Sequence, residues 1–583
     1  MGKGIPDWVK DFRLRDAPKG YTGDLDKAID PTTTIQKAKS RLRAFGNRVL
    51  RNTLRIDSGR LGIPVYISLC GTEAERVIGT KKQMGKGGSP EQAEASALME
   101  LVERYSLFSF RRDQENFWVC STEDFKELAL PVHELWLSVN DREVPQVILK
   151  AFGKLPLRWT WSYCLTDSRP YLLPFDWFWT INEYNGSSAG NLAEEAILQG
   201  ICEVVERHVS ALVSAERLSV PRIELDRLND SKAEELLLKF KRAEILLYLS
   251  DFSLDTGIPT VGALAYDPST YPHRSEIVWT AGTTTSPEKS LVRAITEVAQ
   301  LAGDFDTPSR YVPSGLPKPS SITDMDYILK SPYVKKLSQM ADISHPNMKV
   351  EIERAVQRLS AMGLRVYVLD ITHPKIGIPA FYTVIPGTHF RERAQGKMGT
   401  FVTRLIYETL PPSQAYQILR GITDELREEH YAYFYLGEAS RSLGRYEEAV
   451  KNYELAEQYA PMGYDRLLAL TYKSLTLKEM GNYKGAIESL NRAIALDPES
   501  PELYSLLGNV YYKLGEFNLA IEQFLQALHI NPASAIDYAN IGTNLLKLGK
   551  RDEAIRYYET ALRIDPDLDY ARDKLGQIKD GSR

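Results

Sequence analysis

Long apolar runs are missing from this sequence. Within its 583 residues no apolar run approaches the roughly 18 residues that a membrane-spanning helix needs. The opening residues, Met1 to Pro6, lack the apolar centre of a signal peptide, and the sixth residue is not the Ser or Thr that a myristoylation site requires. We therefore expect a cytoplasmic protein with no membrane partner.

Cysteine and histidine are too few and too scattered for the common metal and redox motifs. The sequence has 4 cysteines and 8 histidines, with no Cys-x-x-Cys pair and no His-Glu-x-x-His motif. Ordinary zinc and dithiol sites are therefore excluded. Cys202 has apolar flanks and is expected to be a small core residue, and a structural role is expected for His208.

A strong imbalance of charge is also absent. The sequence has 72 Lys and Arg against 77 Asp and Glu, which gives no electrostatic reason to expect a nucleic-acid partner. The segment from Gly79 to Lys86 resembles a phosphate-binding P-loop, but it is too long by one residue and Gly87 stands where Ser or Thr should hold Mg²⁺. We reject that interpretation and expect these glycines to let the backbone approach a ligand or a neighbouring strand.

What the sequence does contain is a recurring acidic motif with helical spacing. It occurs twice in full and once in altered form, as Ser96-Ala-Leu-Met-Glu100-Leu-Val-Glu103-Arg104, Gln199-Gly-Ile-Cys-Glu203-Val-Val-Glu206-Arg207 and Arg293-Ala-Ile-Thr-Glu297-Val-Ala-Gln300. One such motif alone is typical of a solvated helix face. Here the motif recurs and its acids lie among apolar neighbours, which indicates buried carboxylates that need cations or metals.

The starts of these helices also match. Ser89-Pro90 and Ser286-Pro287 each offer an N-cap serine followed by a proline at the first helical position. Glu100 and Glu297 lie at the same spacing after their serines, roughly 16 Å along the helix axis. These acids are therefore expected in the middle of helices, away from the helix N-termini.

Convergence of the acids in one place would demand divalent cations between them. Carboxylates on rigid elements suit Mg²⁺, whose coordination is commonly completed by substrate phosphates, so a nucleotide clamped through Mg²⁺ is the predicted ligand. Arg207 and Arg293 are expected to face phosphate oxygens, and Asn191 and Glu195 to add polar contacts to the nucleotide.

These motifs resemble those of the YcaO superfamily over roughly residues 20 to 400. The superfamily builds its ATP site from an S-x3-E-x2-E-R helix, an N-x3-E-A-x3-G-x2-E-x2-E-R helix and an R-x3-E-x2-Q helix. The matching residues here are Ser96, Glu100, Glu103 and Arg104; Asn191, Glu195, Ala196, Gly200, Glu203, Glu206 and Arg207; and Arg293, Glu297 and Gln300.

The resemblance implies the roles of individual residues. The implied Mg²⁺ ligands are Glu100, Glu103, Glu203, Glu206 and Glu297, and the implied ATP-binding residues are Ser96, Arg104, Asn191, Glu195, Arg207, Arg293 and Gln300. Lys27 and Thr34 fall where the family places a Lys and a Ser against the ATP phosphates, and Ser188 is a further nucleotide contact unless it serves only its turn. The family's R-x3-F arginine is represented by Lys397-x3-Phe401, with Arg391 and Arg393 nearby. No residue is assigned as catalytic.

The pattern of elements predicts an α+β domain. Strands are expected at 61–69, 158–164, 171–174, 258–266, 276–282, 364–370 and 376–387, and helices after Asp30 and at 350–362. Strands followed by a loop and an acidic helix occur three times, which indicates antiparallel sheet with helices gathered on one side. Residues 303–345 are expected to form a long surface segment.

The sequence changes character from about residue 430. Gly481, Gly515 and Gly549 recur at a period of 34 residues, and sets of Ala and Pro keep the same period. This is the tetratricopeptide (TPR) pattern, and about four repeats are enough for a continuous solenoid core. We expect a YcaO-type domain at 1–410, a linker helix at 411–430 and TPR repeats at 431–583.

The expected function is ATP- and Mg²⁺-dependent activation of a backbone amide in a peptide or protein substrate. The resemblance implies a thioamide or an azoline product, and a housekeeping role of the thioamidating type or of the kind associated with methylthiolation of ribosomal protein S12. Expected partners are the substrate, a sulfur-delivery protein, a protein bound by the TPR repeats and a second copy of the chain in a homodimer. The alternative is a nucleotide-binding adaptor that acts through its TPR array. The sequence contains none of the motifs that would indicate an ordinary kinase or ligase.

Overall fold

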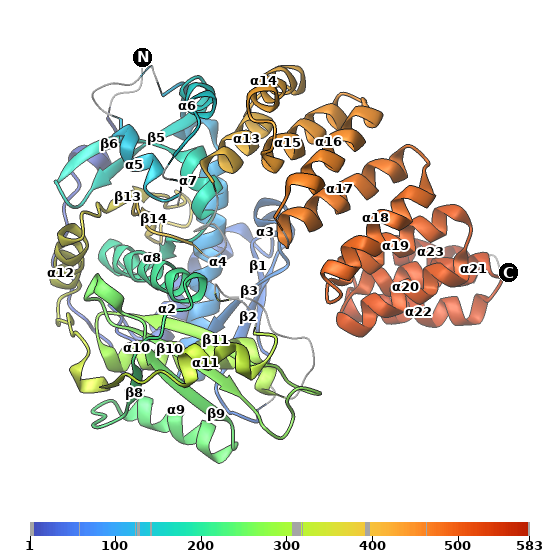
Figure 1. The fold of residues 1–583 in the computed structure, drawn as a ribbon. Coiled ribbons are helices and arrows are strands. Elements are labelled where there is room, and N and C mark those ends of the chain that lie inside the picture. The colour runs from blue at the N-terminus through green and yellow to red at the C-terminus, as the bar shows by residue number, and fades with distance from the viewer. Residues whose placement is uncertain are drawn as a thin grey trace. The chain divides into compact units, whose positions relative to one another are not determined.

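The computed structural model describes residues 5–57, 59–122, 124, 129–139, 141, 143–305, 316, 319–390, 397–461 and 463–580. The chain forms two compact units, one from residues 1–144 and 153–401 and the other from residues 145–152 and 402–583. Figure 1 shows both with their elements labelled. Each unit is described by itself below.

The first unit is built on three sheets. The first has the order β1 (Leu50–Arg55), β2 (Val65–Cys70), β3 (Lys82–Lys86), and the second the order β11 (Val278–Thr283), β10 (Thr260–Tyr266), β9 (Leu246–Asp251), β8 (Arg222–Glu224), β12 (Val334–Lys336). The third has the order β4 (Trp118–Cys120), β5 (Leu157–Cys164), β13 (Tyr367–Asp370), β14 (Ala380–Val384), β7 (Ser187–Ala189), and β6 (Arg169–Pro174) also pairs with β5. All pairs between these strands are antiparallel except β8 with β12, which confirms the predicted α+β class and adds one parallel pair.

Each sheet carries one of the three acidic helices. Helix α4 (Pro90–Arg112) packs on β2 and β3, α8 (Ala193–Ala215) on β14 and β7, and α10 (Pro287–Ala302) on β11 and β10 (Figure 1). The Ser89 hydroxyl accepts a hydrogen bond of 3.2 Å from the Gln92 backbone N–H, as an N-cap serine should. Ser286 occupies the same place before α10, but its side chain makes no capping bond.

The contact between sheet and helix is close because of glycine. A Cβ atom at Gly85 on β3 would lie 2.0 Å from the Ala97 backbone nitrogen of α4, and one at Gly282 on β11 would lie 2.4 Å from the Ala294 backbone nitrogen of α10. The predicted close approach at Gly85 is therefore made to a helix. Any side chain at these positions would push the acidic helix away from its sheet.

The remaining elements of the first unit complete the layers around these sheets. The helices are α1 (Asp7–Lys10), α2 (Pro31–Leu42), α3 (Thr72–Ile78), α5 (Val132–Trp136), α7 (Phe175–Asn182), α9 (Ser231–Arg242), α11 (Asp326–Leu329) and α12 (Met348–Ala361). Helix α2 begins after Asp30, whose carboxylate accepts from the Thr33 N–H, and α12 covers the predicted 350–362 helix. The predicted surface segment is more integrated than expected in its described part, because β12 joins a sheet and Met325 and Ile328 are buried.

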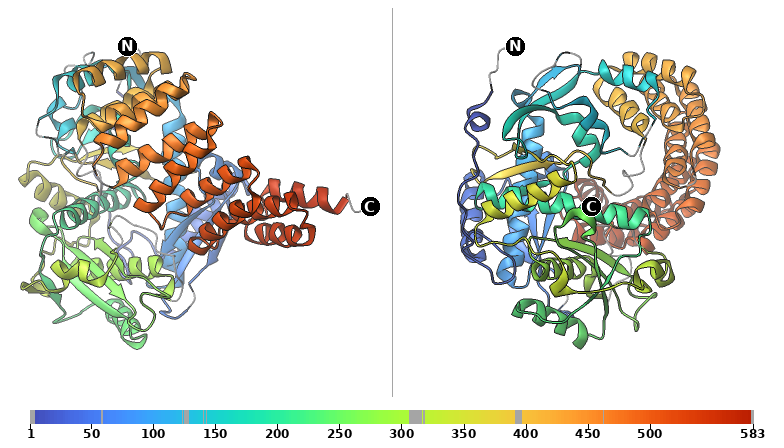
Figure 2. Two further views of the ribbon diagram at one scale, coloured as in Figure 1. Left: turned by 45° about the vertical axis from the view of Figure 1, so that its right-hand side comes forward. Right: turned by 60° about the vertical axis from the view of Figure 1, so that its left-hand side comes forward.

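The second unit is a row of antiparallel helix pairs. Helices α6 (Gln146–Gly153), α13 (Met398–Thr409) and α14 (Pro412–Glu425) accompany four pairs: α15 (His430–Ser442) with α16 (Tyr446–Tyr459), α17 (Tyr464–Glu479) with α18 (Tyr483–Leu496), α19 (Pro501–Leu514) with α20 (Phe517–Ile530), and α21 (Ala535–Lys547) with α22 (Arg551–Ile564). A last helix, α23 (Asp569–Asp580), packs against α22, and Figure 2 shows the row curving from α13 to α23. The four predicted repeats are thus present as helix pairs.

The Gly282 contact gives a test of the fold. We expect Gly282→Ala to destabilise the first unit by about 1–3 kcal/mol, because backbone atoms on α10 cannot move aside as a flexible side chain could. Thermal or urea unfolding followed by circular dichroism measures the effect. Gly421→Ala on α14 is the control, since no heavy atom lies within 4 Å of its Cβ position. Equal stability of Gly282→Ala and wild type would contradict the packing described here.

Candidate nucleotide and magnesium site

One cavity of about 540 Å³ lies among the three acidic helices, β3, α2 and the segment before α2. Fourteen of the predicted site residues line it: Lys27, Thr34, Ser96, Glu100, Glu103, Arg104, Asn191, Glu195, Glu203, Glu206, Arg207, Arg293, Glu297 and Gln300. Residues from positions 27 to 300 thus meet at one place. The sequence motifs share this cavity because each is fixed on a helix whose other face is buried on a sheet.

The arginine of the first motif is held by its own acids. Arg104 Nη1 lies 3.0 Å from Glu103 Oε1, and Nη2 lies 3.8 Å from Glu100 Oε1. The Ser187 hydroxyl donates to the same Glu103 oxygen at 2.7 Å. The Arg104 guanidinium also covers the Tyr184 ring, 3.9 Å from its centroid, so the residue bridges the acids and an exposed aromatic ring.

The second and third helices pair with each other. Arg207 Nη2 lies 3.7 Å from Glu203 Oε1 on the same helix, whereas Arg293 on α10 donates from Nε to Glu206 Oε2 on α8 at 2.9 Å. With its amide oxygen turned toward Arg293, Gln199 accepts from Nη1 at 2.6 Å. The Thr283 backbone N–H donates to Glu206 Oε2 at 2.8 Å. Helices α8 and α10 are therefore locked through one guanidinium.

Lys86 is the cation that the sequence analysis missed. It projects from the end of β3, lines the cavity and forms an ion pair with Glu297. Burial, together with the nearby Arg293 guanidinium, lowers the pKa of Lys86 to about 7. The sequence feature that points to Lys86 is the Gly85-Lys86-Gly87 segment, from which only a close backbone approach at the glycines is predicted.

Ionisation of the two glutamates of the first motif is unfavourable. Burial raises the pKa of Glu103 to about 8, and the Arg104 guanidinium opposes this rise only in part. Burial likewise raises the pKa of Glu100. Carboxylates that resist ionisation in a protein without metal gain most from a divalent cation, because the cation removes the cost of burying their charge.

The cavity lining also includes neutral and charged polar groups from α2, α8 and the segment before α2. Asn191 donates from Nδ2 to the Thr34 hydroxyl at 3.0 Å, while its Oδ1 is buried without a partner. Glu195 Oε2 accepts from the Ala28 backbone N–H at 2.9 Å, and its Oε1 lies 3.9 Å from Lys27 Nζ. The buried Arg207 Nε also lacks a partner in the described structure. Such unpaired groups fit a polar ligand that both donates and accepts.

The residues present fit a nucleotide held with Mg²⁺, although their present positions do not form a finished metal site. Within the residues that the structure describes, no three His, Cys, Asp or Glu side chains gather closely enough to hold a metal ion. Each of the five acids instead has Arg104, Arg207, Arg293 or Lys86 against it. Oxygen donors on rigid helices are the chemistry that Mg²⁺ prefers, so the fit rests on the donor set and not on a preformed geometry.

Several predicted residues lie outside this arrangement. Ser188 does not line the cavity, because its buried hydroxyl donates to the Ala196 carbonyl oxygen at 2.6 Å. Lys397 is exposed and Phe401 is buried, and neither lines the cavity. Arg391 and Arg393 lie outside the described residues.

Cys202 and His208 have the structural roles expected of them. Burial raises the pKa of the Cys202 thiol to about 12, so it stays protonated. Burial lowers the pKa of His208 to about 4, and its Nδ1 accepts from the His389 backbone N–H at 3.0 Å. Neither side chain lines the large cavity.

Models of known protein families match both units of the chain. The family model described as YcaO cyclodehydratase, ATP- and Mg²⁺-binding, matches residues 84–389. Tetratricopeptide models match residues 430–461, 475–515, 501–534 and 535–568. No helix in the described part of the chain is long and apolar enough to cross a membrane.

Similar proteins include both uncharacterised and named ones. The chain is 28% identical to an uncharacterised protein of Methanothermobacter thermautotrophicus, over 62% of this chain and 94% of that protein. It is also 28% identical to the ribosomal protein S12 methylthiotransferase accessory factor YcaO of Escherichia coli, over 32% of this chain and only 35% of that protein.

A solved structure shares the fold. A heterocyclase in complex with substrate and cofactor superposes with a TM-score of 0.54 at 23% identity, over 66% of this chain and 55% of the heterocyclase. Since the family model spans more than half of the sequence, the chain belongs to the YcaO family, and it carries a C-terminal array of TPR repeats.

Proposed function

We propose that this protein uses ATP and Mg²⁺ to activate a backbone amide of a peptide or protein substrate. The observation that carries the proposal is the cavity that fourteen of the predicted site residues line, five glutamates and three arginines among them. A regulatory peptide surface has no need of five glutamates in one cavity, two of them buried, because such crowding is costly unless cations accompany the carboxylates. A polyphosphate with its metal ions supplies those cations.

The chemistry proposed follows the family. A nucleophile adds to the amide carbonyl carbon, the carbonyl oxygen takes the γ-phosphoryl group of ATP, and phosphate then leaves with that oxygen. A Cys, Ser or Thr side chain as nucleophile gives an azoline, and a sulfide equivalent gives a thioamide. Bound Mg²⁺ supplies neutralisation of the phosphate charge.

The residues of this chain supply position and charge. The proposed ligands of the metal ions are Glu100, Glu103, Glu203, Glu206 and Glu297. When the nucleotide binds, Arg104, Arg207 and Arg293 are proposed to leave their carboxylate partners and bind phosphate oxygens. Lys27 and Thr34 are proposed to contact the phosphates, and Asn191 and Glu195 to add polar contacts to the nucleotide. Among the described residues we assign none as catalytic base.

The two product classes lead to different partners. A thioamide product requires a sulfur donor, and similarity to an S12 methylthiotransferase accessory factor makes ribosomal protein S12 a reasonable first candidate substrate.

An adaptor that binds nucleotide without turnover is the competing function. Substrate-stimulated hydrolysis separates the two, because only an amide-activating enzyme couples phosphate release to its substrate.

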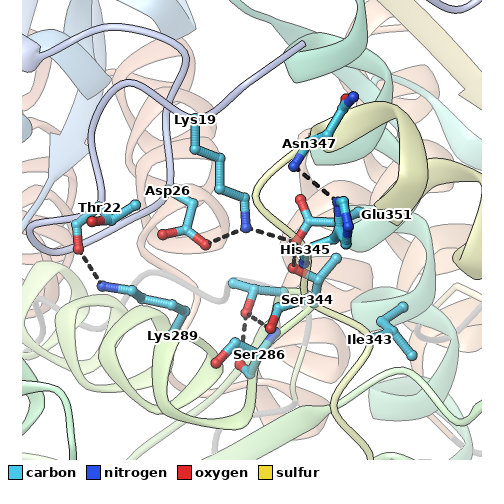
Figure 3. A network of polar contacts seen from close by, with 12 residues as sticks. Lys19, Thr22, Asp26, Ser286, Lys289, Ile343, Ser344, His345, Asn347 and Glu351 are labelled. Atoms are coloured by element: carbon cyan, nitrogen blue, oxygen red, sulfur yellow. Dashed lines mark hydrogen bonds and ion pairs between the residues drawn. The ribbon is translucent and has the colours of Figure 1, made fainter. Parts of the chain in front are cut away.

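A buried ion-pair network fixes the segment that brings Lys27 to the cavity. We call residues 17–30 the N-terminal strap. Lys19 Nζ lies 2.7 Å from both Asp26 Oδ2 on the strap and Glu351 Oε1 on α12 (Figure 3). Glu351 is fully buried and also accepts from the Thr285 hydroxyl at 2.5 Å and from the His345 N–H at 3.0 Å. Lys27 follows Asp26 directly, so this network sets the position of a residue that is proposed to bind the ATP phosphates.

The proposed metal site is tested at Glu203. Wild type is expected to bind ATP only with Mg²⁺, and saturating Mg·ATP should stabilise the first unit by about 2–3 kcal/mol. Glu203→Gln keeps the size of the side chain but removes a proposed metal ligand, so it should lose most of that stabilisation and the ATP hydrolysis. Calorimetry, thermal unfolding and phosphate release measure these effects.

The control for this experiment is Glu234→Gln, an exposed change of the same kind on α9. It should behave like wild type. S12 incubated with enzyme, ATP and a sulfide source should then show, by mass spectrometry, the mass gain of an oxygen-to-sulfur exchange or the loss of one water. Absence of Mg-dependent ATP binding in wild type would sink the enzyme hypothesis, and binding without hydrolysis on any substrate would favour the adaptor.

The position of the strap is tested at Lys19. Lys19→Met leaves Asp26 and the buried Glu351 without their cation and should cost about 3–5 kcal/mol of stability. ATP affinity should fall as well, because Lys27 loses its anchor. Lys10→Met removes the cation of an exposed pair with Asp7 and should cost no more than about 1 kcal/mol. Equal effects of the two variants in unfolding and calorimetry would show that the network does not position the strap.

A further inference from the structure

Lys86 has no part in the function proposed above, although it lines the same cavity. It is the last residue of β3 and forms an ion pair with Glu297 on α10. The side chains of Lys86 and Glu297 are 19% and 10% exposed, and both residues line the cavity, so the pair is largely buried but faces the ligand space. A metal ion at Glu297, one of the proposed metal ligands, would meet this ammonium group.

Lys86 differs from the three arginines of the cavity in the acid with which it pairs. Each arginine contacts an acid on α4 or α8. Among the described residues none of these arginines forms an ion pair with Glu297, and Lys86 is its cation. In the protein without ligands, the charge of the acid on α10 is therefore balanced by a residue of a strand.

The backbone around Lys86 is held on both sides. Gly85 packs so closely on α4 that a Cβ atom there would collide with the helix backbone. On the other side, the Gly88 N–H donates at 3.0 Å to the buried carboxylate of Asp24 in the N-terminal strap. A lysine carries its ammonium group on a flexible four-carbon stem. The ammonium group of Lys86 can therefore leave Glu297 while β3 stays in place.

A divalent cation at Glu297 and the ammonium group of Lys86 would repel each other. Positive charges a few ångström apart cost more free energy in a largely buried place than in water. Without nucleotide, a displaced Lys86 would lose its carboxylate and gain no anion in return, because the neighbouring acids already have arginine partners. With a nucleotide in the same cavity, the phosphate oxygens supply that anion.

We propose that Lys86 takes the place of a metal charge at Glu297 in the protein without ligands, and moves to a phosphate oxygen of the nucleotide when the metal ion binds. The proposal rests on the nucleotide and Mg²⁺ site proposed above and adds a regulation of that site. Lys86 disfavours the binding of a free metal ion to the acidic cavity until a nucleotide is bound with it.

The test measures binding of Mn²⁺, which like Mg²⁺ suits carboxylate ligands, to the full chain by electron paramagnetic resonance. Mn²⁺ is titrated alone and together with a non-hydrolysable ATP analogue. The titrations are made at pH 6.5, below the pKa of Lys86 of about 7, so that its ammonium group is charged. Wild type should bind Mn²⁺ alone weakly and the complex of Mn²⁺ and the analogue tightly.

Lys86→Met should bind Mn²⁺ alone at least about tenfold more tightly than wild type, because the competing charge is gone. It should bind the complex of Mn²⁺ and the analogue no more tightly than wild type, because the contact with phosphate is gone too. The variant leaves Glu297 without its cation and should melt at a lower temperature than wild type. Mn²⁺ alone should then raise the melting temperature of Lys86→Met more than that of wild type.

The control is Lys82→Met on the same strand. Lys82 also lines the cavity, but it is exposed and forms no ion pair with a carboxylate in the described part of the chain. Its loss should change both affinities by less than about twofold, because solvent screens its charge. A second variant, Lys86→Gln, keeps a donor for Glu297 and should show the same differences as Lys86→Met if the latter does not fold.

Equal affinities of wild type and Lys86→Met for Mn²⁺ alone would overturn the proposal, as would equal changes in Lys86→Met and Lys82→Met. A gain of the same size for the complex of Mn²⁺ and the analogue would also overturn it, since Lys86 would then not reach the phosphates. Failure of wild type to bind that complex at all would instead reject the nucleotide site itself, and this proposal with it.

Discussion

The packing of five glutamates into one cavity is the constraint on which the first unit depends. Acids fixed on α4, α8 and α10 cannot move apart, since each helix is held against its own sheet. Four cations, Arg104, Arg207, Arg293 and Lys86, lie against them in return. The cations come from three helices and a strand, so charge balance requires all of these elements to meet. The carboxylates are thereby held close together, and the raised pKa of Glu103 reflects the free-energy cost of burying its charge.

The close contact between sheets and helices serves the same end. Gly85 and Gly282 bring the backbones of β3 and β11 against the middle of α4 and α10, where a side chain would separate them. Because Lys86 follows Gly85 directly, the residue that allows the contact also delivers the cation that pairs with Glu297. Part of the N-terminal strap also lines the cavity, and the position of the strap depends on Lys19, which bridges Asp26 and Glu351.

Local features of the structure could be predicted from sequence, and pairings across the fold could not. The start of α4 at Ser89-Pro90, the acids in the middle of their helices and the period of the TPR array follow from short-range rules, and all are present. The parallel pairing of β8 with β12 and the contact of Arg104 with Tyr184 join residues far apart in the chain, and spacing says nothing about such pairs. Ser188 illustrates the limit. The loop predicted around it suited a nucleotide contact, but Ser188 lies in β7 and its hydroxyl donates to the Ala196 carbonyl oxygen instead.

The pairing of Arg293 gives a reason to expect that nucleotide and metal binding, as proposed for this site, are linked. Its Nε donates to Glu206 and its Nη1 to Gln199, so while both bonds persist only part of the guanidinium is available to a phosphate. Freeing Arg293 alone would leave the buried Glu206 with one backbone N–H of Thr283 and without its ion-pair partner, which is costly. A phosphate without a cation would therefore repel Glu206, and a cation without a phosphate would leave Arg293 beside it. Only the simultaneous exchange of both partners keeps every buried charge compensated, and by linkage each ligand must then raise the affinity for the other.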